Sequence, residues 1–360
     1  MQPRLVHLSG RPYDMGLQYG KLLRDEVHAL AEERLRLSIA HADAAGRRVD
    51  RVHCLALAAR FLPAHETYAP EVFAEFQGIA EGAGIAPELL LIGNGLTDYR
   101  DALAGGPADG GCTAFWARRE AAGGRTLCGQ SWDMHLTAQP FVLLAHRRPE
   151  EGPETLSLTT AGCLSLIGVN ADGIAIGNNN LIPTDPRPGV IYLAMIHRAL
   201  AARTHAEAVR AVTEAPRASG HNYYVADAEG RLCDVETTAA RAAVLSPEGP
   251  TFVHANHYTD PGLLPLAAPL EPGATSPYRE ARLRALLAEA PKPLTPESIR
   301  LCLADHQDSP RSVCVHGEQP GGSITCAVAV ICPETREMWA RVGNACRGPL
   351  FRYALSELGS

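Results

Sequence analysis

A glycine-rich stretch, GGPADGG at residues 105–111, constrains the fold more than any other feature of this sequence. It holds four glycines and one proline in seven residues, a composition that predicts a loop. Apolar residues before this stretch recur at helical spacing, whereas those after it alternate as in β-strands. Cys112 follows directly. A cut before Cys112 would give this residue both a thiol and a free α-amine, which together are a nucleophile and its base.

The periodicity on each side of this loop predicts the organisation of the chain. Helices are expected over residues 14–40, 52–62 and 70–82, with another beginning at Pro87, so that the first hundred residues are mostly helical. The remainder is predicted to alternate antiparallel strands with helix pairs; strands are expected at 112–118, 125–132, 141–146, 155–160, 164–169, 174–176, 223–227, 232–236, 242–245, 324–331 and 337–342, and helices at 190–203, 206–214, 276–289 and 295–305. This alternation predicts an α+β layered core and not a doubly wound sheet.

Composition and charge exclude several classes of partner. The chain has 360 residues, 46% apolar content and a net charge of −7, and its Lys/Arg clusters are no longer than a pair. Nucleic acid and anionic membranes require a basic face, so neither is an expected partner. The N-terminus has no apolar signal segment, and no run is apolar enough to span a membrane. We therefore expect a cytoplasmic protein that acts on a small-molecule substrate. The sequence does not decide whether the protein forms a homo-oligomer.

The chain contains ten cysteines, scattered at positions 54, 112, 128, 163, 233, 302, 314, 326, 332 and 346. With no CxxC pair, they are expected to be reduced, buried thiols and neither a disulfide scaffold nor a zinc ribbon. Cys112 differs because its neighbours are glycine, threonine and aspartate. The sequence therefore favours Cys112 as the reactive thiol.

Two polar motifs allow more than one interpretation. His254 and His257 have the spacing of a metal-ligand pair, but no third ligand follows at a recognisable spacing. They are better explained as polar residues where a strand enters a cleft, so no metal and no cofactor is expected. The three consecutive asparagines 178–180 are expected to form a turn; the alternative is a set of neutral donors for an oxyanion.

Several stretches resemble one enzyme family. DGGCT at 109–113 together with GQSWD at 129–133 resembles the processing site and following strand of the penicillin acyltransferases, also called acyl-coenzyme A:6-aminopenicillanic acid acyltransferases. These are N-terminal-nucleophile hydrolases of peptidase family C45, distantly similar to choloylglycine hydrolases. The similarity continues in the same order along the chain, in the segments 10–20, 77–83, 168–175, 254–257, 305–306 and 312–314.

The resemblance implies a fold and a maturation step. It implies a four-layer αββα sandwich and a precursor cut between Gly111 and Cys112. Residues 1–111 would form a helix-rich segment that is cleaved but retained, and residues 112–360 the catalytic segment, both within one domain. Autoprocessing would free the Cys112 α-amine, which titrates near neutrality and suits a general base.

The resemblance also implies roles for particular side chains. Asp133 would hold the Cys112 ammonium or thiol, and Asn256 would donate to the oxyanion, with Asn179 or Asn180 as a second polar contact. Further residues expected to contact the substrate are Thr113, Gln130, Trp132, Asn180 and His257. Two departures restrict the substrate: Gln130 replaces the arginine of choloylglycine hydrolases, and residues 322–325 lack the arginine of the penicillin enzyme's Ser-Arg pair.

These features predict an autoprocessed cysteine amidase or acyltransferase, suited to bacterial secondary metabolism, that cleaves or transfers the acyl group of a small amide or thioester through an acyl-Cys112 intermediate. One alternative is an uncleaved cysteine amidase with a histidine base, such as His135 or His257. The other is a non-catalytic binding protein on the same fold.

Overall fold

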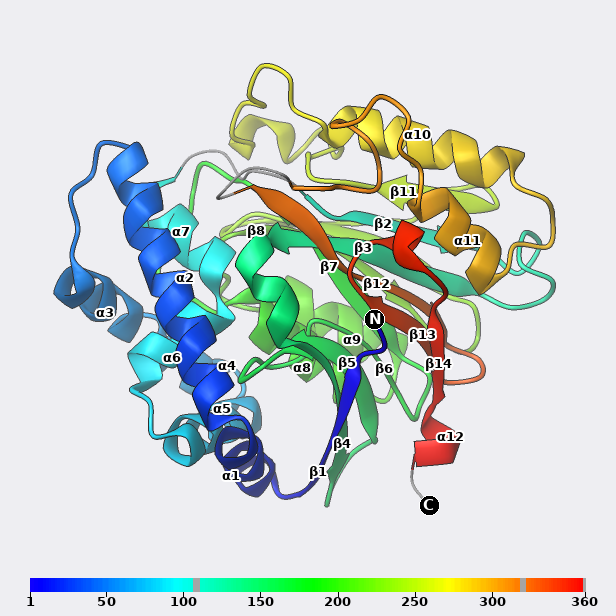
Figure 1. The fold of residues 1–360 in the computed structure, drawn as a ribbon. Helices are drawn as coiled ribbons and strands as arrows, with labels where there is room; N and C mark the ends of the chain where they lie inside the picture. The colour runs from blue at the N-terminus through cyan, green and yellow to red at the C-terminus, as the bar shows by residue number, and fades with distance from the viewer. Residues whose placement is uncertain (106–110, 318–321, 359–360) are drawn as a thin grey trace.

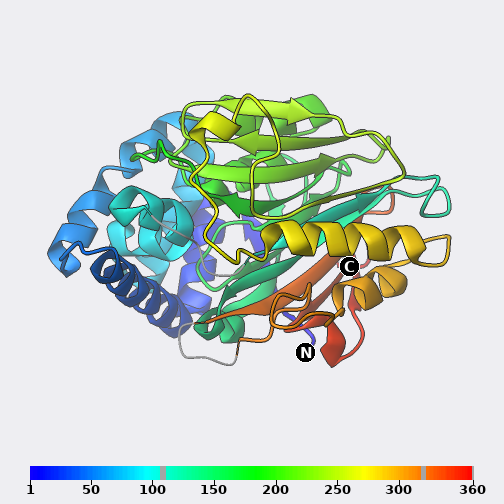
Figure 2. The same cartoon turned by 90° about the horizontal axis from the view of Figure 1, so that it is seen from above.

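Two stacked β-sheets form the centre of the molecule, and helices cover the outer face of each (Figure 1, Figure 2). The computed structural model describes residues 1–105, 111–317 and 322–358. The order of layers is helix, sheet, sheet, helix. This arrangement is the predicted four-layer αββα sandwich of the α+β class, and that prediction is confirmed.

The larger sheet has eight strands. In spatial order they are β1 (Arg4–Gly10), β4 (Val142–Pro149), β5 (Thr155–Thr160), β6 (Ile167–Asn170), β7 (Ala175–Leu181), β8 (Gly220–Ala226), β9 (Leu232–Thr237) and β10 (Ala242–Leu245). Strand β1 pairs with β4 in parallel, and the remaining pairs are antiparallel. The N-terminal segment before Cys112, called the leader below, thus supplies an edge strand. The prediction that the first hundred residues are mostly helical missed this strand.

The smaller sheet has six strands. In spatial order they are β11 (Thr251–His254), β2 (Thr113–Ala117), β3 (Leu127–His135), β12 (Ser323–Cys332), β13 (Glu337–Val342) and β14 (Phe351–Ala354). Alternate residues of β2 face opposite sides, as a strand period of two requires. Ala114 and Trp116 join the main core, whereas Phe115 and Ala117 pack in a second core with Leu283 of α10.

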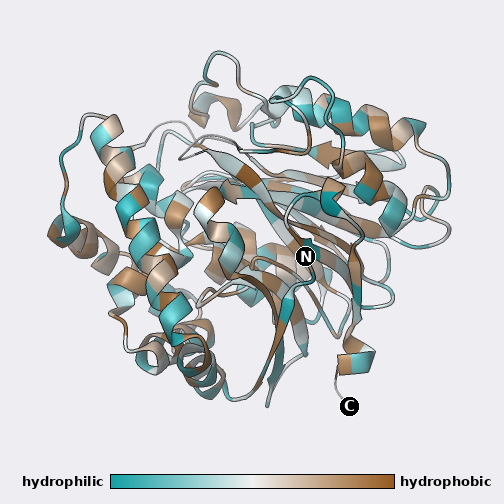
Figure 3. Ribbon diagram, viewed as in Figure 1, coloured by the Kyte–Doolittle hydropathy of each residue, from teal (hydrophilic) through white to brown (hydrophobic). Residues whose placement is uncertain are grey.

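The helices fall into groups around the sheets. The leader forms α1 (Pro12–Leu22), α2 (Arg24–Ala44), α3 (Arg51–Ala59), α4 (Leu62–Tyr68), α5 (Pro70–Ala83), α6 (Pro87–Asn94) and α7 (Leu96–Ala104). The helices α8 (Tyr192–Leu200) and α9 (His205–Thr213) cover the larger sheet, and α10 (Ser276–Glu289) and α11 (Pro296–Leu303) cover the smaller one. A short helix, α12 (Leu355–Leu358), lies near the C-terminus. Three short 3-10 helices lie at η1 (Leu136–Phe141), η2 (Leu264–Leu266) and η3 (Ala345–Arg347). Along α2 and α10, hydrophilic and hydrophobic residues alternate, as expected for helices with one face on a core (Figure 3). None of the helices among the described residues is both long and apolar enough to cross a bilayer.

Close packing of α1 on α5 explains two of the leader motifs. A Cβ added to Gly16 would lie 2.0 Å from the carbonyl oxygen of Glu75, and one added to Gly78 would lie 2.2 Å from that of Tyr13. Only glycine permits this approach of two helix backbones. These motifs therefore serve packing of the leader and contribute no side chain to chemistry.

Candidate active site

Cys112 immediately precedes β2 and lines a cavity of about 300 Å³. The cavity walls come from both parts of the chain: Leu37 on α2 belongs to the leader, whereas Trp132 and Asn178 lie on β3 and β7. Cys112 is buried, and its Sγ lies 3.9 Å from the backbone oxygen of Asp133. The predicted nucleophile thus lines a cavity at the start of β2.

The space beside Gly111 admits no side chain. A Cβ at this position would lie 1.9 Å from Oδ1 of Asn256 and 2.7 Å from Nη2 of Arg279. Steric exclusion therefore explains why glycine occupies this position. The preceding residues Asp109 and Gly110 of the predicted processing motif lie outside the described residues.

Arg279 of α10 is the residue of this site that the sequence analysis missed. Its fully buried guanidinium donates through Nη1 to the backbone oxygen of Cys112 at 2.8 Å and to Oγ1 of Thr113 at 2.7 Å, and through Nη2 to Oδ1 of Asn256 at 2.9 Å. Burial lowers its pKa, an effect that the Asp133 carboxylate opposes. One signal was present in the sequence: Arg279 shares a helix face with Leu283 and Leu287, which are both buried.

Asp133 is the last buried residue of β3, and its carboxyl group is buried with it. Neither of its oxygens has a hydrogen-bond partner of normal geometry among the described residues. Burial raises the pKa of Asp133 to about 7, and the positive charge of Arg279 and an interaction with the Thr325 side chain only partly offset this. A buried acceptor with so little hydrogen bonding is suited to a cationic or donor group beside it.

Burial also sets the protonation state of the nucleophile. Burial raises the pKa of the Cys112 thiol to about 12, with a smaller contribution from Asp133. Reaction at neutral pH therefore requires a base next to the sulfur.

The asparagines divide between two faces of β7. All three lie within this strand, so the predicted turn at 178–180 is wrong. Asn178 and Asn180 line the Cys112 cavity. Asn179 points the other way and donates to Oδ1 of Asn222 at 3.3 Å and to the backbone oxygen of His254 at 3.0 Å. The geometry therefore favours Asn180 over Asn179 as the polar contact near Cys112.

Asn256 lies between Asn180, near the end of β7, and the buried Arg279. Its Nδ2 donates to the backbone oxygen of Asn180 at 2.9 Å, while its own backbone N–H donates to Oγ of Ser276 at 2.7 Å. It borders both the Cys112 cavity and an adjoining pocket of about 710 Å³. Its amide therefore stands where two spaces meet beside the nucleophile.

The residues expected to contact substrate differ in their placement. Trp132 lines the Cys112 cavity, and His257 lines the adjoining pocket. Thr113 is buried against Arg279. Gln130 is buried and exchanges two hydrogen bonds with the backbone of Asn178, at 2.7 and 2.8 Å. Gln130 is thus a link between the two sheets, although the sequence suggested a substrate contact.

The two histidines considered as alternative bases have their ring nitrogens engaged. His135 contacts Oγ1 of Thr137 at 2.7 Å and accepts from Nε of Arg34 at 3.4 Å. Burial, with Arg34, lowers the pKa of His135 to about 3. His257 contacts Oγ of Ser276 at 2.7 Å and the carboxylate of Glu280 at 3.4 Å.

His254 belongs to a buried charge network and holds the segment before Asn256. Its Nε2 lies 2.9 Å from Glu236, and its Nδ1 lies 2.8 Å from the backbone oxygen of Ala255. Burial alone would lower its pKa, but Asp234 and Glu236 raise the pKa of His254 to about 9. A protonated imidazole between two carboxylates accounts for this cluster.

The chain is similar to one curated protein over part of its length. An uncharacterized protein of Archaeoglobus fulgidus is 28% identical over 255 residues, which are 63% of this chain but 42% of that protein. The chain thus spans less than half the length of this curated relative.

Three solved structures are similar at low identity. A mutant of conjugated bile acid hydrolase from Clostridium perfringens is 12% identical, with TM-score 0.46 and coverage of 68% of this chain and 93% of that one. Penicillin V acylase from Agrobacterium tumefaciens is 14% identical, with TM-score 0.46 and coverage of 69% and 87%. The Caenorhabditis elegans ortholog of N-acylethanolamine-hydrolyzing acid amidase is 15% identical, with TM-score 0.45 and coverage of 62% and 93%.

A family model for acyl-coenzyme A:6-aminopenicillanic acid acyl-transferase matches residues 122–347, more than half of the chain. The match includes Asp133, Asn256 and Arg279 and begins ten residues after Cys112. It confirms the resemblance found in the sequence. The chain belongs to the acyl-coenzyme A:6-aminopenicillanic acid acyl-transferase family.

Proposed function

We propose that this protein is an autoprocessed cysteine amidase or acyltransferase whose nucleophile is Cys112. The observation that carries this proposal is the convergence of Asp133, Asn256 and Arg279 on a cysteine that faces a cavity and is preceded by a glycine with no room for a side chain. A buried carboxylate with a raised pKa beside a thiol that lines a cavity supports a catalytic role over a binding role.

Maturation starts with Cys112 Sγ and the carbonyl carbon of Gly111. The thiol attacks this carbon, the C–N bond breaks, and the amine takes up the thiol proton to leave a thioester. Water then hydrolyses the thioester, releasing the Gly111 carboxylate and leaving Cys112 with a free α-amine. Departure of Gly111 opens the space against Asn256 that it fills in the uncut chain.

Turnover then repeats this chemistry on a small amide. The α-amine takes the Cys112 proton, Sγ attacks the substrate carbonyl, and Asn256 Nδ2 donates to the oxyanion. Collapse expels the amine, which receives the proton from the α-ammonium, and the acyl-thioester passes to water or to a second amine. Asp133, whose oxygens have no partner of normal geometry in the uncut chain, would hold the new ammonium.

The two spaces beside Asn256 suggest how the substrate divides. The Cys112 cavity has a mixed lining, in which Leu37, Trp132 and Tyr192 offer apolar surface for a small acyl group. The adjoining pocket is larger and opens past Asn180 and Asn256, so it suits the amine or the acceptor. The substrate class is therefore a small acyl-amide or acyl-thioester with an apolar acyl part.

Intact-mass measurement tests the proposal directly. Wild-type protein is expected to give two chains that divide between Gly111 and Cys112, and Cys112→Ala one chain of full length. Cys326→Ala is the matched control, because the Cys326 thiol is also buried and also contacts β3 backbone oxygens, at 3.8 and 3.7 Å; it should be cut normally. Uncut wild-type protein that still hydrolyses amides would support a histidine base. Uncut protein that no acylating thiol probe labels would support a binding protein.

A further inference from the structure

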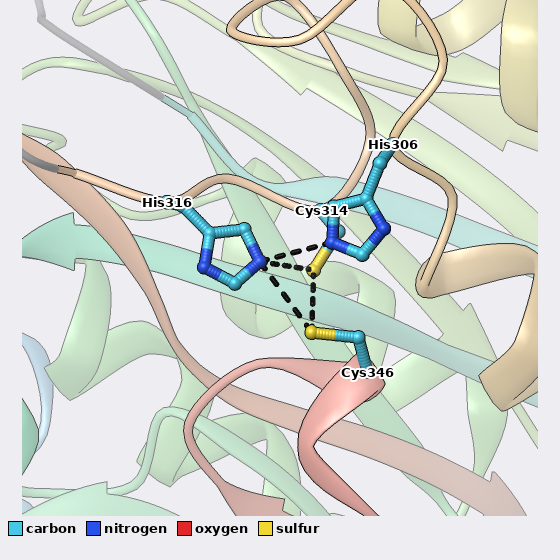
Figure 4. Close-up of side chains that lie close together, drawn as sticks. All are labelled: His306, Cys314, His316 and Cys346. Carbon is cyan, nitrogen blue, oxygen red and sulfur yellow. Dashed lines mark hydrogen bonds between the residues drawn. The ribbon is translucent and has the colours of Figure 1, made fainter.

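Two cysteines and two histidines meet on the side of the smaller sheet that α10 and α11 cover (Figure 1). His306, Cys314 and His316 lie on the loop between α11 and β12, and Cys346 lies on η3 (Figure 4). Their ligand atoms all lie within 4.8 Å of one another. Two thiols and two imidazoles facing a common centre are the ligand set of a structural zinc site.

The distances within this cluster match a metal tetrahedron. With Zn–S of about 2.3 Å and Zn–N of about 2.0–2.1 Å, tetrahedral geometry places two sulfurs about 3.8 Å apart, sulfur and nitrogen about 3.6 Å apart and two nitrogens about 3.3 Å apart. The two Sγ atoms are 3.9 Å apart, and Nε2 of His316 lies 3.5 Å from Cys314 Sγ and 3.4 Å from Cys346 Sγ. The two Nε2 atoms are 3.0 Å apart.

The surroundings also suit a bound metal. Nδ2 of Asn344 donates to Cys314 Sγ at 3.6 Å and to the backbone oxygen of Val315 at 2.7 Å, which orients the thiol from behind. The two sulfurs are not joined in a disulfide, since they lie 3.9 Å apart and an S–S bond is about 2.05 Å long. None of the four residues lines the Cys112 cavity.

We propose that His306, Cys314, His316 and Cys346 bind one Zn²⁺ ion in a closed, structural site. Each thiol loses a proton to solvent on binding, and both imidazoles bind as neutral ligands. Soft thiolates with imidazoles in a tetrahedron favour zinc over magnesium or calcium. With all four positions filled by protein, the ion has no open position for a substrate.

The site would brace the loop that supports the Asp133 region. Val315 exchanges hydrogen bonds with Thr325 of β12: its N–H donates to Thr325 Oγ1 at 3.1 Å, and its oxygen accepts from Thr325 N at 3.0 Å. Thr325 in turn pairs with Asp133 across β12 and β3. Zinc would therefore fix the position of the loop 304–317 against this strand and against η3.

Metal analysis of the Cys112→Ala precursor tests the site apart from the proposed enzyme activity. Protein purified without chelators is expected to hold about one zinc per chain. After removal of zinc under reducing conditions, Co²⁺ should give the intense visible bands of a tetrahedral ion and a sulfur-to-metal charge-transfer band. Because both measurements use an unaltered ligand set, they do not depend on whether a ligand variant folds.

Two variants then assign the ligands. Cys346→Ser should lower zinc affinity by at least about tenfold. Cys233→Ser is the matched control, since Cys233 also faces one imidazole, with Sγ 3.8 Å from Nε2 of His205, and it should keep zinc. Reduced precursor that binds neither Zn²⁺ nor Co²⁺, a mass two hydrogens short from a Cys314–Cys346 disulfide, or unchanged affinity in Cys346→Ser would each overturn the proposal.

Discussion

Cys112 and Cys314 lie in different polar surroundings, and the difference bears on the roles that we propose for them. Cys112 lines a cavity together with Asp133 and Asn256, and Arg279 donates to its backbone oxygen. The Cys314 thiol lies within 4.8 Å of a second thiol and of the nitrogens of two imidazoles. A nucleophile needs an open approach and a base, whereas a structural metal ligand needs a closed set of donors.

The first prediction compares the two centres directly and carries the largest effect. Cys112→Ala should lower amide turnover by more than about 10³-fold, because the variant has no nucleophile. Cys346→Ser should keep turnover within about threefold, provided that the variant is assayed below its unfolding temperature. Turnover of N-acyl amides, with circular dichroism as a check of folding, makes the comparison. A similar loss in both variants would contradict the division of roles.

The second prediction concerns the oxyanion donor. Asn256→Ala should lower kcat by about 10²–10³-fold, as found when one such donor is removed elsewhere. Asn179→Ala is the matched control, because the Asn179 amide points to the opposite face of β7. Steady-state kinetics on matured protein decides the matter. A larger kcat loss in Asn179→Ala than in Asn256→Ala would reverse the assignment.

The third prediction tests the space beside Gly111. Gly111→Ala should slow maturation by at least about tenfold, because the new Cβ would meet Asn256 and Arg279. Gly105→Ala serves as the control, since a Cβ there meets nothing within 4 Å, although its φ of 66° adds some strain. The fraction of cut chain against time, measured by gel, gives the rates. Normal cutting of Gly111→Ala would show that the close contact is not required.

The fourth prediction follows from the raised pKa of Asp133, about 7 in the folded precursor against 3.8 as its ordinary value. Between these values the folded state binds more protons than the unfolded state, so this group makes the free energy of unfolding fall as the pH rises from about 4 to 7. Asp133→Asn in the Cys112→Ala background should remove that fall, which amounts to about 2 kcal/mol between pH 5 and pH 7.

Denaturant unfolding of both precursors at about pH 5 and pH 7 measures this difference. Asp101 is buried as well, and burial raises its pKa to about 7, so Asp101→Asn shows what a carboxylate away from Cys112 contributes. If Asp133→Asn left the pH dependence unchanged, Asp133 would be ionised in the precursor.

The fifth prediction, with the smallest expected effect, concerns Asn344, which contacts the proposed zinc ligand Cys314. Asn344→Ala should weaken zinc binding by about tenfold, because the Asn344 amide orients Cys314. Competition with a chromophoric chelator measures the affinity. A zinc affinity equal to that of the wild type would show that Asn344 does not contribute to zinc binding.

The order of predictability along the chain has a physical cause. The helix-to-strand change at residues 105–112, the layered α+β class and the singular setting of Cys112 are visible in the sequence because they depend on neighbours in the chain. The edge strand β1 was missed because its partner β4 begins more than a hundred residues later. The predicted roles of Asp133 and Asn256 came from the family resemblance, and the structure brings both side chains to Cys112.

The sequence by itself determined the fold class and singled out Cys112 with its glycine neighbour as the candidate nucleophile, since local composition and periodicity carry this information. Tertiary structure decided the rest. It brought Arg279 onto Cys112 from a helix far along the chain, turned Asn179 away from the cavity that its two neighbours line, and gathered His306, Cys314, His316 and Cys346 from two separate segments. No short motif encodes that last set, because its members become neighbours only when the loop after α11 packs against η3.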